Sequence, residues 1–137
     1  MLLATMKAHG GYAALVSGGF TAFTAAVAGG LGFDENRANV LGVADGVLTG
    51  TVAEPILGGE AKLRALHEIT ARLGISPAEV LAVGDGANDL PMLRAAGTGV
   101  ALHAKPRVQA ECEVRVNHGD LTALLFVQGY GRGEFTE

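Results

Sequence analysis

Residues 80–89, Val-Leu-Ala-Val-Gly-Asp-Gly-Ala-Asn-Asp, join an uninterrupted apolar run to a loop that carries two aspartates. A continuous apolar run is typical of a parallel strand that is covered on both faces. A helix is expected from about residue 89 to residue 96, because Gly97 is placed to end it. In an open parallel sheet, ligands bind beyond the carboxyl ends of the strands. This stretch therefore predicts an α/β fold with a candidate site at Asp85 and Asp89.

The two aspartates are four residues apart, and Asn88 shares their loop. Mg²⁺ is often bound by one or two carboxylates, while substrate phosphate and water complete its octahedron. The loop therefore predicts a magnesium site with Asp85 as the metal ligand. A structural alternative makes Asp89 a helix N-cap and Asp85 a turn residue, but it does not explain why both acids and Asn88 crowd one loop.

The pattern of strand, loop and helix also occurs near the start of the chain. An apolar run at 13–16 stops at Ser17-Gly18-Gly19 and leads into a plausible helix at 20–31. The Ser17 hydroxyl can bind an anion, and Gly18 and Gly19 allow backbone N–H groups to approach it closely at the start of a helix. The same three residues also suit a plain strand-to-helix turn, and the pattern alone does not decide between the two.

A helix is predicted from about residue 60 to residue 73. Four apolar residues share one stripe of it: Leu63, Leu66, Ile69 and Leu73. Lys62 lies at the start of this helix, where a positive charge meets the unfavourable end of the helix dipole. Helix energetics alone do not favour a lysine there, so Lys62 is a candidate phosphate ligand; a solvated surface lysine is the alternative.

Strands that alternate with helices indicate a mainly parallel sheet. Residues 38–52 predict a β-hairpin, because Asp45-Gly46 lies between two apolar pairs. The further predicted elements are a short capped helical turn at 76–79, strands at 99–102 and 113–116, and a last helix at 120–127.

The composition of the chain excludes several classes of function and partner. The chain has 137 residues, 49% of them hydrophobic, which suits one compact domain over residues 1–137. A net charge of -4 without a Lys or Arg cluster argues against nucleic acid as a partner. No stretch approaches the roughly 18 to 20 apolar residues of a membrane helix, so a soluble protein without a membrane partner is expected. Cys112 is the one cysteine, and a chain without disulfides favours the cytoplasm.

The order of these motifs resembles a known superfamily. Residues 17–20, Lys62 and residues 84–89 look like motifs two, three and four of the haloacid dehalogenase superfamily. Bacterial phosphoserine phosphatases have connecting segments similar to three further stretches, residues 45–50, 104–106 and 118–125. The resemblance thus covers nearly the whole chain. The fourth motif is also similar to that of P-type ion pumps, but those pumps carry membrane helices.

The resemblance implies a Rossmann-like parallel sheet with flanking helices and a magnesium-dependent phosphatase. The implied reaction is hydrolysis of O-phosphoserine to serine and phosphate, a step of serine biosynthesis, through an aspartyl-phosphate intermediate. A phosphotransferase of the same superfamily would share every motif.

The resemblance also assigns roles to single residues. Residues 17–19 would hold the phosphoryl oxygens, and Lys62 would neutralise their charge. Asp85 would bind magnesium, and Asp89 would orient Lys62 or a metal-bound water. Asn88 would contact the phosphate or the substrate. Electrostatic stabilisation of the transferring group is the main task of such a site.

One motif of the superfamily is absent from the 137 residues: the first, Asp-x-Asp-x-Thr/Val, which supplies the nucleophile and the acid/base. Asp34 and Asp45 do not replace it, because neither follows a buried strand upstream of Ser17. The helical cap that selects the substrate is absent as well. We therefore expect a carboxy-terminal part of a phosphatase core that is inactive in isolation. A noncatalytic module that binds phosphate, metal or a partner protein is the alternative.

The absent motif also has a structural consequence. In the superfamily its strand lies in the middle of the sheet, so the fold is expected to be incomplete. We expect a second copy of the chain, an exchanged strand or an amino-terminal segment to supply that strand, as open sheet edges invite.

Overall fold

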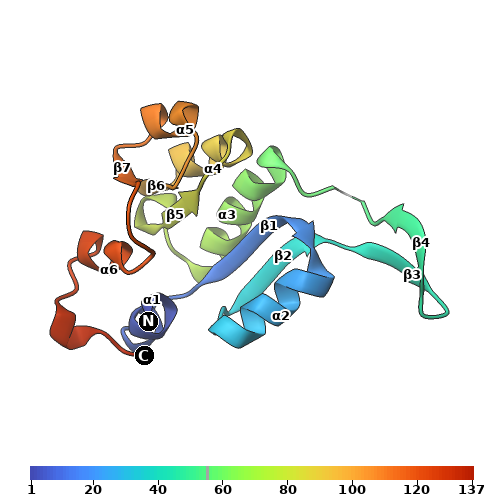
Figure 1. The fold of residues 1–137 in the computed structure, drawn as a ribbon, viewed down its shortest axis with the longest axis horizontal. Coiled ribbons are helices and arrows are strands. Elements are labelled where there is room, and N and C mark those ends of the chain that lie inside the picture. Colours follow the sequence, from blue (N-terminus) through green and yellow to red (C-terminus); the bar gives the residue numbers. More distant parts are fainter. Residues whose placement is uncertain (55) are drawn as a thin grey trace. The chain divides into compact units, whose positions relative to one another are not determined.

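The computed structural model describes residues 1–54 and 56–137, and these fall into two compact units. Unit 1 comprises Met1–Leu57 and Leu121–Glu137, and unit 2 comprises Gly58–Asp120. Each unit is built from strands and helices (Figure 1). The single domain over residues 1–137 stays a prediction.

Unit 1 contains a parallel pair of strands, β1 and β2, connected by helix α2, which packs against both of them. The order of its elements is α1 Leu2–Ala8, β1 Ala14–Phe20, α2 Thr21–Leu31, β2 Glu35–Asn39, β3 Leu41–Ala44, β4 Val47–Val52, α6 Ala123–Val127 and the 3₁₀ turn η3 Arg132–Glu134. The helices predicted at 20–31 and 120–127 are therefore present, although α6 begins three residues later than expected.

Strand β1 extends past the point where the sequence predicted its end. Ser17, Gly18 and Gly19 lie inside the strand, and the register shifts between Val16 and Phe20. The predicted strand ended at Val16, so its end was wrong by four residues. The physical reason is a β-bulge, which interrupts the ladder while the chain stays extended.

Strand β2 was not predicted, because its sequence Glu-Asn-Arg-Ala-Asn has no apolar run. Its polar side chains have partners instead. Glu35 accepts hydrogen bonds from Tyr12 and Arg37, and Asn36 accepts one from Thr24. Cross-strand and side-chain contacts thus replace apolar burial in holding this strand.

The predicted hairpin is confirmed. Strands β3 and β4 pair antiparallel, and Asp45 and Gly46 form the turn with φ values of 51° and 75°. Two consecutive left-handed residues are what a two-residue hairpin turn of type I′ requires. The apolar side chains next to the turn, Val43, Val47 and Leu48, are all exposed.

Unit 2 is a three-stranded parallel sheet in the order β5-β6-β7 with helices around it. Its elements are α3 Gly59–Leu73, the 3₁₀ turn η1 Pro77–Glu79, β5 Leu81–Gly84, the 3₁₀ turn η2 Ala87–Asp89, α4 Leu90–Ala95, β6 Thr98–Leu102, α5 Pro106–Glu111 and β7 Val114–Val116. The capped turn at Ser76 is confirmed: its side chain accepts from the Ala78 N–H, and Glu79 accepts from the Ser76 N–H. Helix α5 and the 3₁₀ turn η2 were not predicted.

The core of unit 2 lies around the central strand β6. Val100, Ala101 and Val108 are fully buried, and Cys112 lies in the same apolar cluster as Ala101 and Val108. Cys112 is thus a core residue, and burial raises the pKa of its thiol.

Helix α3 is present as predicted, but its buried face is rotated from the predicted stripe. The residues buried along it are Lys62, Ala65, Leu66, Ile69 and Thr70. Leu73 of the predicted stripe is 38% exposed. Lys62 belongs to the buried face of the helix. A face predicted from apolar residues alone could not include a lysine.

Several strands leave an edge open. In the part of the chain that the structure describes, β1 and β2 pair only with each other, and β5 and β7 pair only with β6. Each therefore presents a row of backbone N–H and C=O groups without a ladder partner. No helix of the described residues is long and apolar enough to cross a membrane.

Candidate active site

The most buried charged contact of unit 2 joins helix α3 to the loop after β5. Lys62 Nζ lies 2.6 Å from Asp89 Oδ1 and donates a hydrogen bond to it. Lys62 is 8% exposed and Asp89 is 4% exposed. The alternative of a solvated surface lysine is therefore excluded, and Asp89 balances the charge that the start of the helix disfavours.

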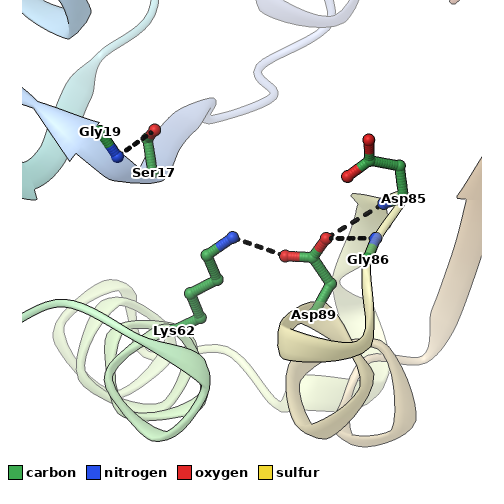
Figure 2. A network of polar contacts seen from close by, with 6 residues as sticks. All are labelled: Ser17, Gly19, Lys62, Asp85, Gly86 and Asp89. Atoms are coloured by element: carbon green, nitrogen blue, oxygen red, sulfur yellow. Dashed lines mark hydrogen bonds and ion pairs between the residues drawn. The ribbon is translucent and has the colours of Figure 1, made fainter.

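The second oxygen of Asp89 is also engaged. Oδ2 accepts hydrogen bonds from the N–H groups of Asp85, at 3.0 Å, and Gly86, at 3.1 Å, as Figure 2 shows. Burial raises the pKa of the Asp89 carboxyl, but the bonds from Lys62, Gly86 and Asp85 outweigh it and hold the pKa below its ordinary value. Asp89 is thus a fixed, ionised carboxylate that holds the loop and the lysine together.

The glycines of this loop make room for that carboxylate. A Cβ on Gly84 would lie 2.5 Å from the Cβ of Asp89, so only glycine permits the Asp89 side chain to fold back over the end of β5. A Cβ on Gly86 would lie 2.8 Å from Asn88 Oδ1. Asn88 itself is exposed. The packing of the acidic loop therefore requires glycine at position 84, whereas a side chain at position 86 would meet only the movable end of Asn88.

Asp85 occupies the position that the sequence predicted, directly after the last residue of β5. Its side chain is exposed, and its carboxylate makes none of the hydrogen bonds drawn in Figure 2. Its backbone is fixed, because its N–H donates to Asp89 and its C=O accepts from the Lys105 N–H at 3.2 Å. The alternative of Asp85 as a plain turn residue accounts for the backbone but gives the carboxylate no task.

Among the described residues, no group of three or more His, Cys, Asp or Glu side chains could hold a metal ion together. Both oxygens of Asp89 already accept hydrogen bonds. Asp85 is thus the carboxylate of this loop that remains to offer oxygens to a hard cation.

Ser17, Gly18 and Gly19 belong to unit 1, where they form the bulge of β1. The Gly19 N–H donates a hydrogen bond of 3.0 Å to Ser17 Oγ (Figure 2). Gly18 and Gly19 are exposed, and Ser17 is half-buried. These residues lie inside β1 and do not form the strand-to-helix turn that the sequence left open as an alternative. Both glycines are at the surface.

Sequence reasoning missed one residue of this bulge region. Asn39, at the end of β2, is 7% exposed, and both atoms of its amide are hydrogen-bonded, to Gly18 and to Leu57. An asparagine in a polar strand gives no periodic signal, so the sequence offers no reason to select it.

Comparisons with known proteins agree with the geometry. A family model for haloacid dehalogenase-like hydrolases matches residues 1–94. The phosphoserine phosphatase of Polaromonas sp. is 50% identical over 115 residues, which make up 81% of this chain and 49% of that protein. The phosphoserine phosphatase of Albidiferax ferrireducens is 49% identical over 128 residues, covering 90% of this chain and 54% of that protein.

A solved structure supports the same relationship. A probable phosphoserine phosphatase from Vibrio cholerae, in unliganded form, is 38% identical, with a TM-score of 0.87 over 90% of this chain and 38% of that one. The predicted α/β fold is thereby confirmed. The chain spans about half the length of the curated relatives named above. Because the family model matches well over half of its residues, the chain belongs to the haloacid dehalogenase-like hydrolase family.

Proposed function

We propose that this chain supplies the phosphate-binding and metal-binding part of a magnesium-dependent phosphomonoesterase that hydrolyses O-phosphoserine. The observation that carries the proposal is the buried contact of Lys62 with Asp89, directly beside the exposed carboxylate of Asp85. The similarity to phosphoserine phosphatases over most of the chain supports the choice of substrate.

In unit 2, three side chains have separate tasks. Lys62 donates to a phosphoryl oxygen with the N–H bonds that Asp89 leaves free, and its charge stabilises the phosphoryl group as it transfers. Asp89 holds the ammonium group in place. Asn88, exposed on the same loop, contacts the phosphate or the substrate.

Asp85 is the proposed metal ligand. Mg²⁺ usually takes only one or two protein carboxylates, so a single free carboxylate at a strand end fits it. When bound, the ion would neutralise the charge of the phosphate oxygens. Its remaining ligands would come from substrate, water and residues outside this chain.

In unit 1, the Ser17 hydroxyl and the backbone of Gly18 and Gly19 are the proposed phosphate ligands. Their exposure and the absence of side chains at two of the three positions support this role. The nucleophile is proposed to lie on a strand outside these 137 residues that pairs with an open edge, as the single-sided pairing of β1 and β5 allows.

The test compares the chain alone with a chimera. The chimera joins this chain to the part of the Polaromonas sp. phosphoserine phosphatase that the match does not cover. We expect magnesium-dependent release of phosphate from O-phosphoserine by the chimera and none by the chain alone. Lys62→Ala and Asp85→Asn are each expected to lower the rate of the chimera at least about 100-fold.

Two matched variants serve as controls. Arg64→Ala removes an exposed cation from the same helix, and Asp45→Asn removes an exposed carboxylate at a turn whose positive φ asparagine tolerates. Both are expected to leave the rate unchanged. A chimera that stays active with Asp85→Asn would refute the metal role, and a chain that turns over by itself would refute the need for an outside nucleophile.

A further inference from the structure

Asn39 connects three backbone segments of unit 1. Its Nδ2 donates a hydrogen bond of 2.9 Å to the Gly18 C=O, and its Oδ1 accepts one of 2.6 Å from the Leu57 N–H. The side chain is more than nine-tenths buried. A buried amide with both ends satisfied has one orientation only, because exchanging its oxygen and nitrogen would oppose like groups at both contacts.

The contact with Gly18 lies where the ladder between β1 and β2 is interrupted. Val16 is opposite Arg37, and Phe20 is opposite Asn39, so residues 17–19 of β1 face a single residue of β2. Within such a bulge the backbone groups lose their regular ladder partners. The Asn39 side chain takes the place of a strand in binding the Gly18 carbonyl.

The two hydrogen bonds at the bulge act on one rigid group. The C=O of Gly18 and the N–H of Gly19 belong to the same planar, trans peptide unit, so they point in opposite directions. Asn39 binds the carbonyl end, and Ser17 Oγ binds the N–H end at 3.0 Å. The orientation of this peptide therefore determines the rotamer of Ser17 as well.

Glycine gives this segment no stiffness of its own. Gly18 and Gly19 have access to many more backbone conformations than other residues, and a Cβ on Gly18 would touch only the Leu57 C=O, at 3.7 Å. Neighbouring atoms therefore do not confine the peptide sterically. The hydrogen bonds from Asn39 and to Ser17 are what hold it.

We propose that Asn39 is a positioning residue, which orients the Gly18–Gly19 peptide and through it the Ser17 hydroxyl for binding a phosphate group. This inference rests on the proposed role of residues 17–19 in phosphate binding. It adds a residue that does not itself touch phosphate, and it assigns the bulge of β1 a task.

The test uses two substitutions in the 137-residue chain, with inorganic phosphate as the probe. Asn39→Ala removes both hydrogen bonds. Asn39→Asp keeps the acceptor for the Leu57 N–H but places a carboxylate against the Gly18 C=O, which it repels. When protonated, the introduced carboxyl donates again, so lowering the pH restores the original hydrogen bond.

The readouts are amide NMR shifts and the Kd for phosphate from pH 7.5 to 4.5. We expect the Gly19 amide resonance to move in both variants and the Kd to rise at least about tenfold at pH 7, as loss of one charge-assisted contact would do. Relative to the unmodified chain, the loss of phosphate affinity in Asn39→Asp should become smaller as pH falls, whereas the loss of affinity in Asn39→Ala should not. Asn36→Ala is the matched control, because Asn36 lies on the same strand but bonds to Thr24.

The outcomes separate this inference from the proposed function. A Gly19 amide that does not move in either Asn39 variant overturns the inference, whether or not phosphate binds. If Ser17→Ala weakens phosphate binding and the Asn39 variants do not, the inference fails and the phosphate role stands. If Ser17→Ala and both Asn39 variants all leave the Kd unchanged, the phosphate role fails and this inference fails with it. A loss of phosphate affinity in Asn39→Asp that does not change with pH would also overturn the inference, because a general structural defect would lower the affinity at every pH.

Discussion

Replacing Asp89 by Asn tests the buried pair with a minimal change of shape. One end of the new amide faces Lys62 Nζ and the other faces the N–H groups of Asp85 and Gly86, but only one end can accept a hydrogen bond. Lys62 also keeps its charge at 8% exposure. Breaking a buried ion pair by removing one partner costs about 3 to 5 kcal/mol, a large share of the roughly 5 to 15 kcal/mol that stabilises a domain.

We therefore expect Asp89→Asn to lower the free energy of unfolding at pH 7 by about 3 kcal/mol, measured by urea denaturation followed by far-ultraviolet circular dichroism. The double variant Lys62→Met with Asp89→Asn should recover part of this loss, because no unpaired charge remains buried. A loss below about 0.5 kcal/mol, the range of ordinary surface substitutions, would refute the reasoning.

The pH dependence of this loss has a definite sign. Because the folded-state pKa of Asp89 lies below its ordinary value, its carboxylate contributes stability that is fully present above the unfolded pKa of about 3.9. That contribution is lost as pH falls through the lower folded-state pKa. The difference between the unmodified chain and Asp89→Asn should thus stay constant from pH 7 to about 5 and narrow below. If the difference in free energy of unfolding were as large at the most acidic pH at which both proteins stay folded as it is at pH 7, an ionised Asp89 would not be its cause.

Three further predictions concern the glycine loop, the buried thiol and the open edges. Gly84→Ala should displace Asp89, since the new Cβ would lie 2.5 Å from the Asp89 Cβ, and overpacking of this kind costs about 1 to 3 kcal/mol of stability. The chimera that carries Gly84→Ala should lose phosphate release. An unchanged rate would contradict the proposed role of Asp89. Cys112→Ala should cost about 1 kcal/mol in urea denaturation and leave phosphate release unchanged, because the thiol lies in the core. The chain alone should be a marginally stable monomer in sedimentation. If the absent strand carries about four large apolar residues, each worth roughly 1.5 to 3 kcal/mol when buried, its loss removes about as much free energy as stabilises a whole domain. Strong protection of the amides of residues 14–16 and 81–83 from hydrogen exchange in a dilute monomer would contradict an absent strand.

The sequence predicted the elements whose signals are local. The hairpin follows from the turn preferences of Asp45 and Gly46, and helix α3 follows from an apolar period with Gly74 at its end, where φ is 70°. Strand β2 could not be found this way, because its stability comes from partners such as Thr24 and Tyr12 that the fold brings to it. Strand β1 was placed correctly but ended too early, since two glycines ordinarily mark a turn and here mark a bulge.

The candidate site also contains residues that local sequence predicts and residues that it does not. Asp85 and Asp89 follow a buried strand in an acidic loop, so their neighbourhood could be predicted from spacing alone. The contact of Lys62 with Asp89 was only an implication of the superfamily resemblance, because the residues that it joins are 27 positions apart. Asn39 was not predicted at all. Its partners, Gly18 and Leu57, are backbone groups, which leave no trace in the identity of the residues that supply them.

The buried pair is better explained by function than by stability. Replacing a buried ion pair by well-packed apolar residues is often neutral or stabilising, and a lysine in the first turn of a helix opposes the helix dipole. Unit 2 nevertheless keeps Lys62 there and keeps glycine at position 84, where a Cβ would displace the carboxylate that holds the lysine. Three features that are each unfavourable or restrictive by themselves thus serve one result, an ammonium group fixed beside the exposed Asp85. Stability alone gives no reason to keep all three, and the proposed binding of a phosphate group at the end of β5 supplies one.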